Sequence, residues 1–444
     1  MKKYFGTDGV RGRANEVLTV KIAYQIGRFI GQYPSGHKNK ILIGRDTRLS
    51  GDMFDAALIS GLTQSGAIVY ELGITTTPSI SYLVEQERFD FGIMISASHN
   101  PYFDNGIKIF APSGEKISAK IEAEIENYIN RGSDDLPCLK NKEIGYVIDA
   151  KHLLDKYLDF LVSNAGDLSS LRIVVDCAHG SASVLARKLF TDRLKIDATY
   201  LNETFNGTDI NYLCGSTHLE QITNETKNGN YDLGLAFDGD ADRLILISRD
   251  GNVIDGDKVL YLCALNFKKH HDLKDDTIVL TIMSNLGLKK ALAKEGIFFE
   301  EVDVGDKYVQ AKLKEKDLML GGEQSGHIIF YRDLNTGDGL LTALKVMNVV
   351  AKENKTLDQL VDKLTILPQV LKNEKVSNKV AVMESKELKV LIEEIERELG
   401  EEGRILVRPS GTEQLIRVMV EAKTKELCEY YVDKTIALVK DLSF

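Results

Sequence analysis

The 444-residue sequence lacks the segments that mark exported or membrane-spanning chains. Two lysines follow the first methionine, but no apolar segment comes after them, and no apolar run is long enough to span a membrane. The five cysteines are odd in number and show no CxxC spacing. We therefore expect a cytoplasmic protein with free thiols, no export signal and no membrane contact.

The sequence also lacks a surplus of positive charge, since its formal net charge is -10. A protein that coats nucleic acid needs a basic face, so a nucleic-acid partner is not expected, whereas small anionic ligands remain open. A phosphate-binding loop of the GxxxxGK[ST] type is missing too. The nearest segment, GQYPSGHK at 31–38, has His37 before Lys38 and no hydroxyl residue after it, which argues against a kinase of that class.

The composition that is present is typical of a folded protein. Hydrophobic residues make up 43% and charged residues 27% of the chain, and no low-complexity segment occurs. A chain of this length exceeds one hydrophobic core, and three or four domains are expected.

Apolar, β-branched segments recur in the same order three times. Each unit has a strand, a helix, a second strand, and a third strand that leads directly into a polar loop. The third strands with their loops are FDFGIMISASHN at 89–100, YDLGLAFDGDADR at 231–243 and KDLMLGGEQSGH at 316–327. Another strand and a helix follow each loop.

Strands that alternate with helices predict right-handed βαβ crossovers and mainly parallel sheets with helices on both faces. Ligands bind such sheets beyond the carboxyl ends of the strands. The loops SASHNP, DGDADR and GEQSGH hold the same position in three similar units. We therefore expect them to converge on one cleft.

From about residue 370 the pattern changes. We expect a strand at VSNKVAVM (376–383), a charged helix at 385–400, two strands on either side of RPSGTE, and a final helix. The predicted fold class is α/β, with three similar mixed α/β domains whose sheets are mainly parallel and a smaller C-terminal α+β domain. The predicted domains are 1–150, 151–252, 253–367 and 368–444.

DGDADR places Asp238, Asp240 and Asp242 at alternating positions just after a strand. Three carboxylates in one turn repel each other unless a cation lies among them, and oxygen ligands of this kind suit Mg²⁺ or Ca²⁺. An EF-hand is excluded because its sixth and twelfth positions would be Arg243 and Arg249. An acidic surface turn is disfavoured by the strongly apolar flanks. The motif predicts a metal site.

RPSGTE combines the Arg408 guanidinium with the hydroxyls of Ser410 and Thr412 and with backbone amides beside Gly411. A guanidinium can bind phosphate in bidentate fashion while a glycine turn presents amides to the other oxygens. The motif favours a phosphate site. The alternative is an ordinary turn with an incidental arginine.

GEQSGH offers Glu323 and Ser325 between two glycines, an arrangement that suits vicinal sugar hydroxyls, and His327 could move a proton near neutral pH. A glycine turn with a fully hydrogen-bonded histidine is the alternative.

Ser98 has no evident triad partner, but as a phosphoserine beside a cation it would be a phosphoryl donor. Asn105-Gly106 predicts a tight turn that returns Lys108 to the same cleft.

The glycine loop FGTDGVRG carries Arg11, and GRDTRLSG carries Arg45 and Arg48. For each of these arginines taken singly, a surface salt bridge is the simplest interpretation. The functional interpretation depends on the motifs together.

FGTDGVRG, GRDTRLSG, ISASHNP, DGDADR, GEQSGH and RPSGTE, in this order, resemble the motifs of the α-D-phosphohexomutase superfamily over essentially the whole chain. GEQSGH, TIMSNLGL, VDVGDKYV, NTGDG and CGSTHLE are most similar to the bacterial phosphoglucosamine mutase branch. Gln414 departs from the proline that often follows RPSGTE, which loosens that turn slightly.

The resemblance implies four domains around a central cleft and the interconversion of glucosamine 6-phosphate and glucosamine 1-phosphate, which feeds UDP-N-acetylglucosamine and cell wall synthesis. It implies a phosphoserine enzyme, one Mg²⁺ per chain, glucosamine 1,6-bisphosphate as intermediate and activator, and a homodimer. The same chemistry on glucose or mannose phosphates is the alternative. A non-catalytic sugar-phosphate sensor is disfavoured because Ser98 and all three aspartates of DGDADR are present.

The resemblance also assigns roles to residues at matching positions. Catalytic candidates are Ser98 as the phosphoserine, with Lys108, Arg11, His327 and His99 for proton transfer and charge stabilisation. Metal candidates are Ser98 through its phosphate, Asp238, Asp240 and Asp242. Substrate-binding candidates are Arg243, Glu323, Ser325, Arg408, Ser410, Gly411, Thr412 and Arg417.

Overall fold

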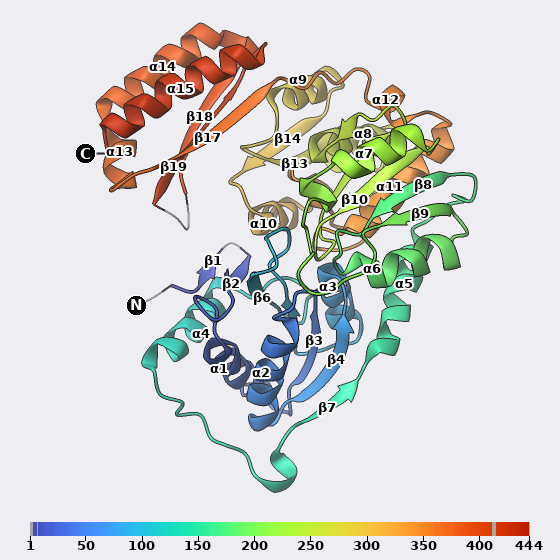
Figure 1. Ribbon diagram of the computed structural model, residues 1–444, viewed down its shortest axis with the longest axis vertical. Coiled ribbons are helices and arrows are strands. Elements are labelled where there is room, and N and C mark those ends of the chain that lie inside the picture. Colours follow the sequence, from blue (N-terminus) through green and yellow to red (C-terminus); the bar gives the residue numbers. More distant parts are fainter. Residues whose placement is uncertain (1–2, 7, 411–413, 444) are drawn as a thin grey trace. The chain divides into compact units, whose positions relative to one another are not determined.

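The computed structural model describes residues 3–6, 8–410 and 414–443. The chain forms two compact units, one made of residues 1–283 with 297–362 and the other of residues 284–296 with 363–444. Figure 1 shows the elements of both. Each unit is described by itself.

The first sheet of the larger unit has the order β1-β2-β6-β5-β3-β4-β7. Its strands are β1 (Phe5–Gly6), β2 (Gly9–Arg13), β3 (Lys40–Arg45), β4 (Ile68–Ile74), β5 (Phe91–Ile95), β6 (Asp104–Phe110) and β7 (Tyr146–Asp149). The strands β5, β3, β4 and β7 run parallel, whereas β6, β2 and β1 are added in antiparallel fashion. The sheet is therefore mixed.

Side-chain alternation along these strands gives each face its own partners. Ile43 and Ile93 belong to the apolar cluster formed with α1 (Val20–Gly31), α2 (Gly51–Gln64) and α4 (Ala119–Arg131). On the opposite face, a Cβ added at Gly92 would lie 2.4 Å from Val84 of α3 (Thr77–Gln86). Helices thus cover both faces, as the sequence predicts (Figure 1).

The second and third sheets repeat this plan on a smaller scale. The second has the order β12-β11-β10-β8-β9, and the third has the order β14-β13-β15-β16. Their strands are β8 (Arg172–Asp176), β9 (Asp197–Leu201), β10 (Leu233–Phe237), β11 (Leu244–Ser248), β12 (Val253–Ile254), β13 (Thr277–Thr281), β14 (Phe298–Val302), β15 (Leu320–Gly322) and β16 (Ile328–Phe330). In both sheets the central strands run parallel and the edge after the polar loop is antiparallel.

Several helices pack around these two sheets. They are α5 (Leu154–Ser163), α6 (Ala182–Arg187), α7 (Glu220–Asn228), α8 (Gly256–Lys269), α10 (Asp306–Lys316), α11 (Gly339–Glu353) and α12 (Leu357–Leu360). The helix α11 is almost entirely buried because ten of its fifteen residues are buried, among them Leu340, Leu344 and Met347.

The predicted strand-loop-strand repeat is present in all three sheets. The loop after β5 leads into β6, the loop after β10 into β11, and the loop after β15 into β16, each time as an antiparallel pair. In the first of these pairs the expected turn is misplaced, because Asn105 and Gly106 lie inside β6. The chain turns earlier, where the amide of Asp104 donates to the carbonyl of Pro101 at 3.1 Å.

The smaller unit contains an antiparallel sheet of order β17-β19-β18, from β17 (Gln369–Lys375), β18 (Arg404–Pro409) and β19 (Leu415–Glu421). Four helices accompany it, α9 (Leu286–Lys294), α13 (Lys379–Glu384), α14 (Lys386–Leu399) and α15 (Lys425–Asp441). The strand predicted at 376–383 is wrong, because β17 ends at Lys375 and Asn378 then caps α13 by accepting from the amides of Val380 and Ala381.

All five cysteines are free, as predicted. Within the part of the chain that the structure describes, no helix has both the length and the apolar character needed to cross a membrane.

Candidate active site

Ser98 follows the buried strand β5 by three residues, in a loop that bends sharply. Its backbone has φ 53°, a left-handed conformation that costs a non-glycine residue about 1–2 kcal/mol. The Ser98 amide donates to Ser96 Oγ at 2.8 Å, and the Ser98 hydroxyl donates to Asp238 Oδ2 at 2.5 Å. The serine loop of the first sheet and the acidic loop of the second sheet therefore meet at Ser98 Oγ, which is buried.

The acidic loop gathers its three carboxylates around one point. Asp238, Asp240 and Asp242 are buried, and one oxygen from each lies within 4.8 Å of the others. Asp240 Oδ1 is buried and accepts no hydrogen bond from the described residues. An all-oxygen donor set with an unpartnered buried carboxylate oxygen fits Mg²⁺.

The protonation of this loop follows from its crowding. Burial raises the pKa of Asp238 well above its usual value, and the charges of Asp242 and Asp240 raise it further. For Asp242, burial also favours the neutral acid, but Lys108, His327 and Arg243 outweigh it and hold the pKa well below the usual range. The two carboxyl groups are thus shifted in opposite directions, Asp238 toward the protonated form and Asp242 toward the carboxylate.

Lys108 extends from β6 into the same carboxylates and is 1% exposed. Its Nζ lies 2.7 Å from Asp240 Oδ2, 3.0 Å from Asp242 Oδ2 and 3.2 Å from Asp8 Oδ2. Burial alone would lower the pKa of Lys108, but the charges of the three aspartates raise it well above the usual value. The residue is thus a fixed ammonium group in the metal-free site.

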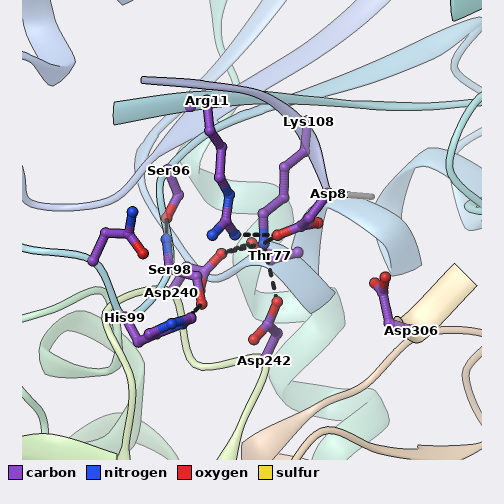
Figure 2. A network of polar contacts seen from close by, with 12 residues as sticks. Asp8, Arg11, Thr77, Ser96, Ser98, His99, Lys108, Asp240, Asp242 and Asp306 are labelled. Atoms are coloured by element: carbon purple, nitrogen blue, oxygen red, sulfur yellow. Dashed lines mark hydrogen bonds and ion pairs between the residues drawn. The ribbon is translucent and has the colours of Figure 1, made fainter. Parts of the chain in front are cut away.

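A line of alternating charges continues from Lys108 across the larger unit, and Figure 2 shows its first member, Asp8, beside Lys108. Asp8 pairs with Lys108, Lys116 pairs with both Asp8 and Asp306, and Asp306 begins α10 beside the third sheet. Burial raises the pKa of Asp8, but Lys108, Lys116 and Arg11 outweigh it and lower the pKa well below normal. These ion pairs join the first sheet to the third.

Figure 2 shows His99 next to Ser98, and Arg11 next to Asp8. Arg11 pairs with Asp8, and its pKa is raised because the charges of Asp8 and Asp240 outweigh its burial. Burial lowers the pKa of His99 to about 4, and the nearby Arg243 and Arg11 act in the same direction. His99 is therefore a neutral imidazole at neutral pH, with Nδ1 3.4 Å from Ser98 Oγ.

His327 is buried, and each ring nitrogen has its own partner. The Gly337 amide donates to His327 Nε2 at 3.1 Å, and Nδ1 lies 3.7 Å from Asp242 Oδ1. An N-H directed at Nε2 fixes the proton of the neutral ring on Nδ1. Burial lowers the pKa of His327, but Asp242, Asp306 and Glu323 outweigh it and the net direction is upward.

The two predicted sugar ligands lie in the loop between β15 and β16. The Glu323 side chain is half-buried and accepts from the Gly305 amide at 3.1 Å through Oε1, whereas Ser325 is exposed. Arg243, at the end of the acidic loop, lies 3.8 Å from Asp242 through Nε and is raised in pKa by Asp242 and Asp238 despite its burial. These groups come from two different sheets of the larger unit.

The predicted phosphate site belongs to the smaller unit. Arg408 of β18 and Arg417 of β19 are direct cross-strand neighbours. Two arginines that lie opposite each other in a sheet can donate to the same anion. The Ser410 amide donates to the Leu415 carbonyl at 2.9 Å, which closes the turn. Gly411 and Thr412 lie outside the described residues.

Arg48 contradicts the expectation of a surface salt bridge. Its side chain is fully buried, and Nε donates to the equally buried Asp46 Oδ2 at 2.9 Å. The rest of its guanidinium binds carbonyls of the serine loop. The signal that could have indicated this is its position in a motif that ends a buried strand.

Asp8, Lys116 and Asp306 were also missed as members of the site. Asp8 and Asp306 lie in FGTDGVRG and VDVGDKYV, two motifs that the sequence does mark. Lys116, in a polar turn before α4, carries no such mark.

The comparisons with known proteins agree with this geometry. The four domain models of the phosphoglucomutase/phosphomannomutase family match the chain in order: the alpha/beta/alpha domains I, II and III at residues 2–135, 155–251 and 255–366, and the C-terminal domain at 371–438.

Among curated proteins, the phosphoglucosamine mutase of Bacillus subtilis is 48% identical over 443 residues, which cover 99% of both chains. That of Lachnospira eligens is 45% identical over 449 residues and covers all of both chains.

Solved structures show the same fold at low identity. A phosphoglucomutase/phosphomannomutase family protein from Burkholderia thailandensis superposes with a TM-score of 0.80 at 23% identity over 98% of this chain and 97% of that one. The Aspergillus fumigatus N-acetylphosphoglucosamine mutase, solved with GlcNAc-6P and magnesium, has a TM-score of 0.72 at 18% identity and covers 100% and 96%. With its domain models matched in order and its relatives aligned end to end, the chain belongs to the phosphoglucomutase/phosphomannomutase family, the α-D-phosphohexomutases.

Proposed function

We propose that this chain interconverts glucosamine 6-phosphate and glucosamine 1-phosphate through a phosphorylated Ser98, and thereby supplies UDP-N-acetylglucosamine synthesis. The mechanism rests on one observation. Ser98 Oγ is buried and lies 2.5 Å from Asp238, the first carboxylate of the three-aspartate loop. The choice of the amino sugar is supported by the full-length curated relatives, which are phosphoglucosamine mutases.

The chemistry requires two matched phosphoryl transfers. In the first, the Oγ–P bond of phosphorylated Ser98 breaks while a free sugar hydroxyl forms a new O–P bond, and the hydroxyl proton passes to a base. Ser98 then takes up a proton, and the sugar becomes glucosamine 1,6-bisphosphate. After the bisphosphate turns around, its other phosphate returns to Ser98 by the reverse step.

Asp238, Asp240 and Asp242, with the Ser98 phosphate, would hold one Mg²⁺, which when bound withdraws charge from the transferring phosphoryl oxygens. Metal ligands bind in their deprotonated forms, so a bound cation would lower the raised pKa of Asp238. Lys108, fixed between Asp240 and Asp242, places a second positive charge beside Ser98.

The candidates for the base that accepts the hydroxyl proton are Lys108, Arg11, His99 and His327. His99 enters the reaction as a neutral ring, because its pKa is about 4. His327 offers Nδ1-H toward Asp242, while Nε2 is occupied by the Gly337 amide. Lys108 and Arg11 are held in their charged forms by aspartates, which suits charge stabilisation better than proton abstraction.

Substrate binding is assigned to the remaining candidates. Glu323 and Ser325 would bind sugar hydroxyls, with Arg243 directed at the phosphoryl oxygens. Arg408, Ser410, Gly411, Thr412 and Arg417 would bind the phosphate that is not transferred. Two guanidinium groups opposite each other on adjacent strands support this role, because each can bind a phosphate in bidentate fashion.

The domains at 1–150, 151–252, 253–367 and 368–444, a homodimer and a cytoplasmic location complete the proposal. Four separate sheets support the four domains, except that β12 at 253–254 belongs to the second sheet, and the free cysteines support the cytoplasmic location.

A coupled assay tests the function. The purified chain is given Mg²⁺ and glucosamine 6-phosphate, and formation of glucosamine 1-phosphate is followed beside glucose and mannose phosphates and beside Ser98→Ala. We expect the highest kcat/KM on the amino sugar and no turnover by the variant. Equal or better use of glucose or mannose phosphates would refute the substrate, and an active Ser98→Ala would refute the mechanism.

A further inference from the structure

Two carbonyl oxygens of the serine loop are each held by the same pair of donors. Arg48 Nη2 donates to the Ser98 carbonyl at 2.8 Å and to the Asn100 carbonyl at 2.8 Å. Asn211 Nδ2 donates to the same two carbonyls at 2.9 Å and 3.1 Å. Arg48 follows β3 of the first sheet, whereas Asn211 belongs to the segment between β9 and α7 of the second. We call this arrangement the carbonyl clamp.

The Arg48 half of the carbonyl clamp is rigid. Nε donates to Asp46 Oδ2 at 2.9 Å, and Nη1 donates to the Asp104 carbonyl at 3.0 Å and to the Pro101 carbonyl. A planar guanidinium with this many fixed acceptors has one orientation. Arg48 thereby defines where the whole segment from Ser98 to Asp104 lies.

The Asn211 half comes from a segment with no other evident role in the reaction. Asn211 is 7% exposed, its amide donates to the Ala178 carbonyl at 3.0 Å, and its φ is 59°. Asparagine tolerates this left-handed conformation better than most residues. The backbone therefore presents the side-chain amide to the serine loop without added strain.

The hydrogen bonds of the carbonyl clamp fix the orientation of the Ser98 hydroxyl, because the loop is strained at Ser98. The left-handed φ of Ser98 directs its hydroxyl to Asp238, and the loop would relax if the peptide after Ser98 could rotate. Gly239 lies so close that a Cβ there would be 2.6 Å from the Ser98 carbonyl, which leaves space for the two donors only. Two hydrogen bonds to that carbonyl oppose the rotation.

We propose that Asn211 is a positioning residue for phosphoryl transfer, which acts with Arg48 through the backbone of Ser98 and Asn100. This rests on the proposed function of Ser98. Asn211 touches no reacting atom; it keeps Ser98 Oγ in line with the acidic loop in both transfers, whichever end of the sugar faces it.

The test uses two substitutions to residues that tolerate the left-handed backbone conformation of Asn211. Asn211→Gly removes the side chain, and Asn211→Asp keeps its shape but replaces the donor with a carboxylate that repels both carbonyls. Because a displacement of about 1 Å can cost about a hundredfold in rate, we expect kcat to fall about 10- to 100-fold, most in Asn211→Asp. KM should stay within about twofold, since the substrate contacts remain.

Asn206→Ala is the matched control, because Asn206 lies in the same segment and, among the described residues, its side chain bonds to Thr208 and Asp209 within that segment. It should keep the kcat of the unmodified chain. The single-turnover loss of phosphate from phosphorylated Ser98, followed by intact mass, should slow in both Asn211 variants by the same factor as kcat.

The outcomes distinguish failure of the proposed function from failure of the positioning role of Asn211. Turnover by the unmodified chain decides the proposed function independently of any variant. If that chain is active and both Asn211 variants keep its kcat, the positioning role is refuted. The role is also refuted if KM rises in step with a fall in kcat, or if Asn206→Ala loses as much activity. A lower kcat at constant KM, confined to the Asn211 variants, supports it.

Discussion

Replacing Lys108 by methionine should destabilise the larger unit unless a divalent cation is present. Methionine keeps the length of the side chain but removes the ammonium group that faces Asp8, Asp240 and Asp242 at 2.7–3.2 Å. The group is 1% exposed, so little water can replace it. The variant therefore leaves buried carboxylates without their common partner.

The magnitude follows from the cost of breaking a buried ion pair. Removing one partner of such a pair costs about 3–5 kcal/mol. Proton uptake by one of the aspartates offsets part of that cost, and it is easier at low pH, so the loss should be larger at pH 8 than at pH 6. At about 2–4 °C per kcal/mol, the first unfolding transition should move down by about 6–20 °C at pH 8.

Mg²⁺ should reverse the effect. A ligand that binds only the folded state stabilises it in proportion to the logarithm of its concentration over Kd. The variant presents uncompensated carboxylates to the ion, so saturating Mg²⁺ should raise its Tm more than that of the unmodified chain. The measurement is differential scanning calorimetry of both chains at two pH values, with and without Mg²⁺.

Lys156→Met is the control. Lys156 is 53% exposed and pairs with Glu87 at 2.7 Å, so its loss should cost within about 1 kcal/mol. If Lys108→Met unfolds no earlier than Lys156→Met in the absence of Mg²⁺, the electrostatic account of the site is wrong.

Three further predictions follow from single contacts. Burial, and then Glu71, raise the pKa of Asp55 from 3.8 to about 7. Between pH 3.8 and pH 7 the folded chain therefore binds one proton more than the unfolded chain. Its free energy of unfolding falls as the pH rises through this range. Asp55→Asn should be more stable than the unmodified chain by about 2–4 kcal/mol at pH 8 but not at pH 4, and equal urea midpoints at pH 8 would refute this. The neutral His327 ring should carry its proton on Nδ1, because the Gly337 amide donates to Nε2; ¹⁵N chemical shifts of labelled histidine would contradict this by showing Nε2-H. Arg417→Lys should raise KM about tenfold with little change in kcat, because it loses bidentate phosphate contact only; an unchanged KM would remove Arg417 from the phosphate site.

The convergence of the serine and acidic loops was predictable because it depends on a repeat. Loops that occupy the same position in similar βαβ units emerge at corresponding sheet edges, and the 2.5 Å contact between Ser98 and Asp238 is the outcome. The misplaced turn at Asn105-Gly106 has a local cause. Asn105 is fully buried, its Nδ2 donates to Ser50 Oγ at 2.9 Å, and this tertiary contact outweighs its preference for a turn.

Long-range polar contacts could not be predicted from the sequence. An isolated arginine is usually exposed, and nothing near Arg48 in sequence shows that carbonyls fifty residues later accept from it. Lys116 is similar, because its partners Asp8 and Asp306 lie 108 and 190 residues away. Composition and periodicity report on local structure and on apolar faces, so ion pairs between sheets leave no signal in them.

Carboxylates and cations alternate around Ser98, and this limits the cost of burying so many charges in one site. Among the described residues, the carboxylates are Asp8, Asp238, Asp240, Asp242 and Asp306, and the cations are Lys108, Lys116, Arg11 and Arg243. A phosphoserine adds a charge of about -1.5 to -2, which a divalent cation offsets. In the proposed mechanism the phosphoryl group moves between Ser98 and the sugar beside these same charges, so both transfers take place in the same electrostatic surroundings. A permanent excess of either charge at these buried positions would instead favour one end of the reaction, which a reversible mutase must avoid.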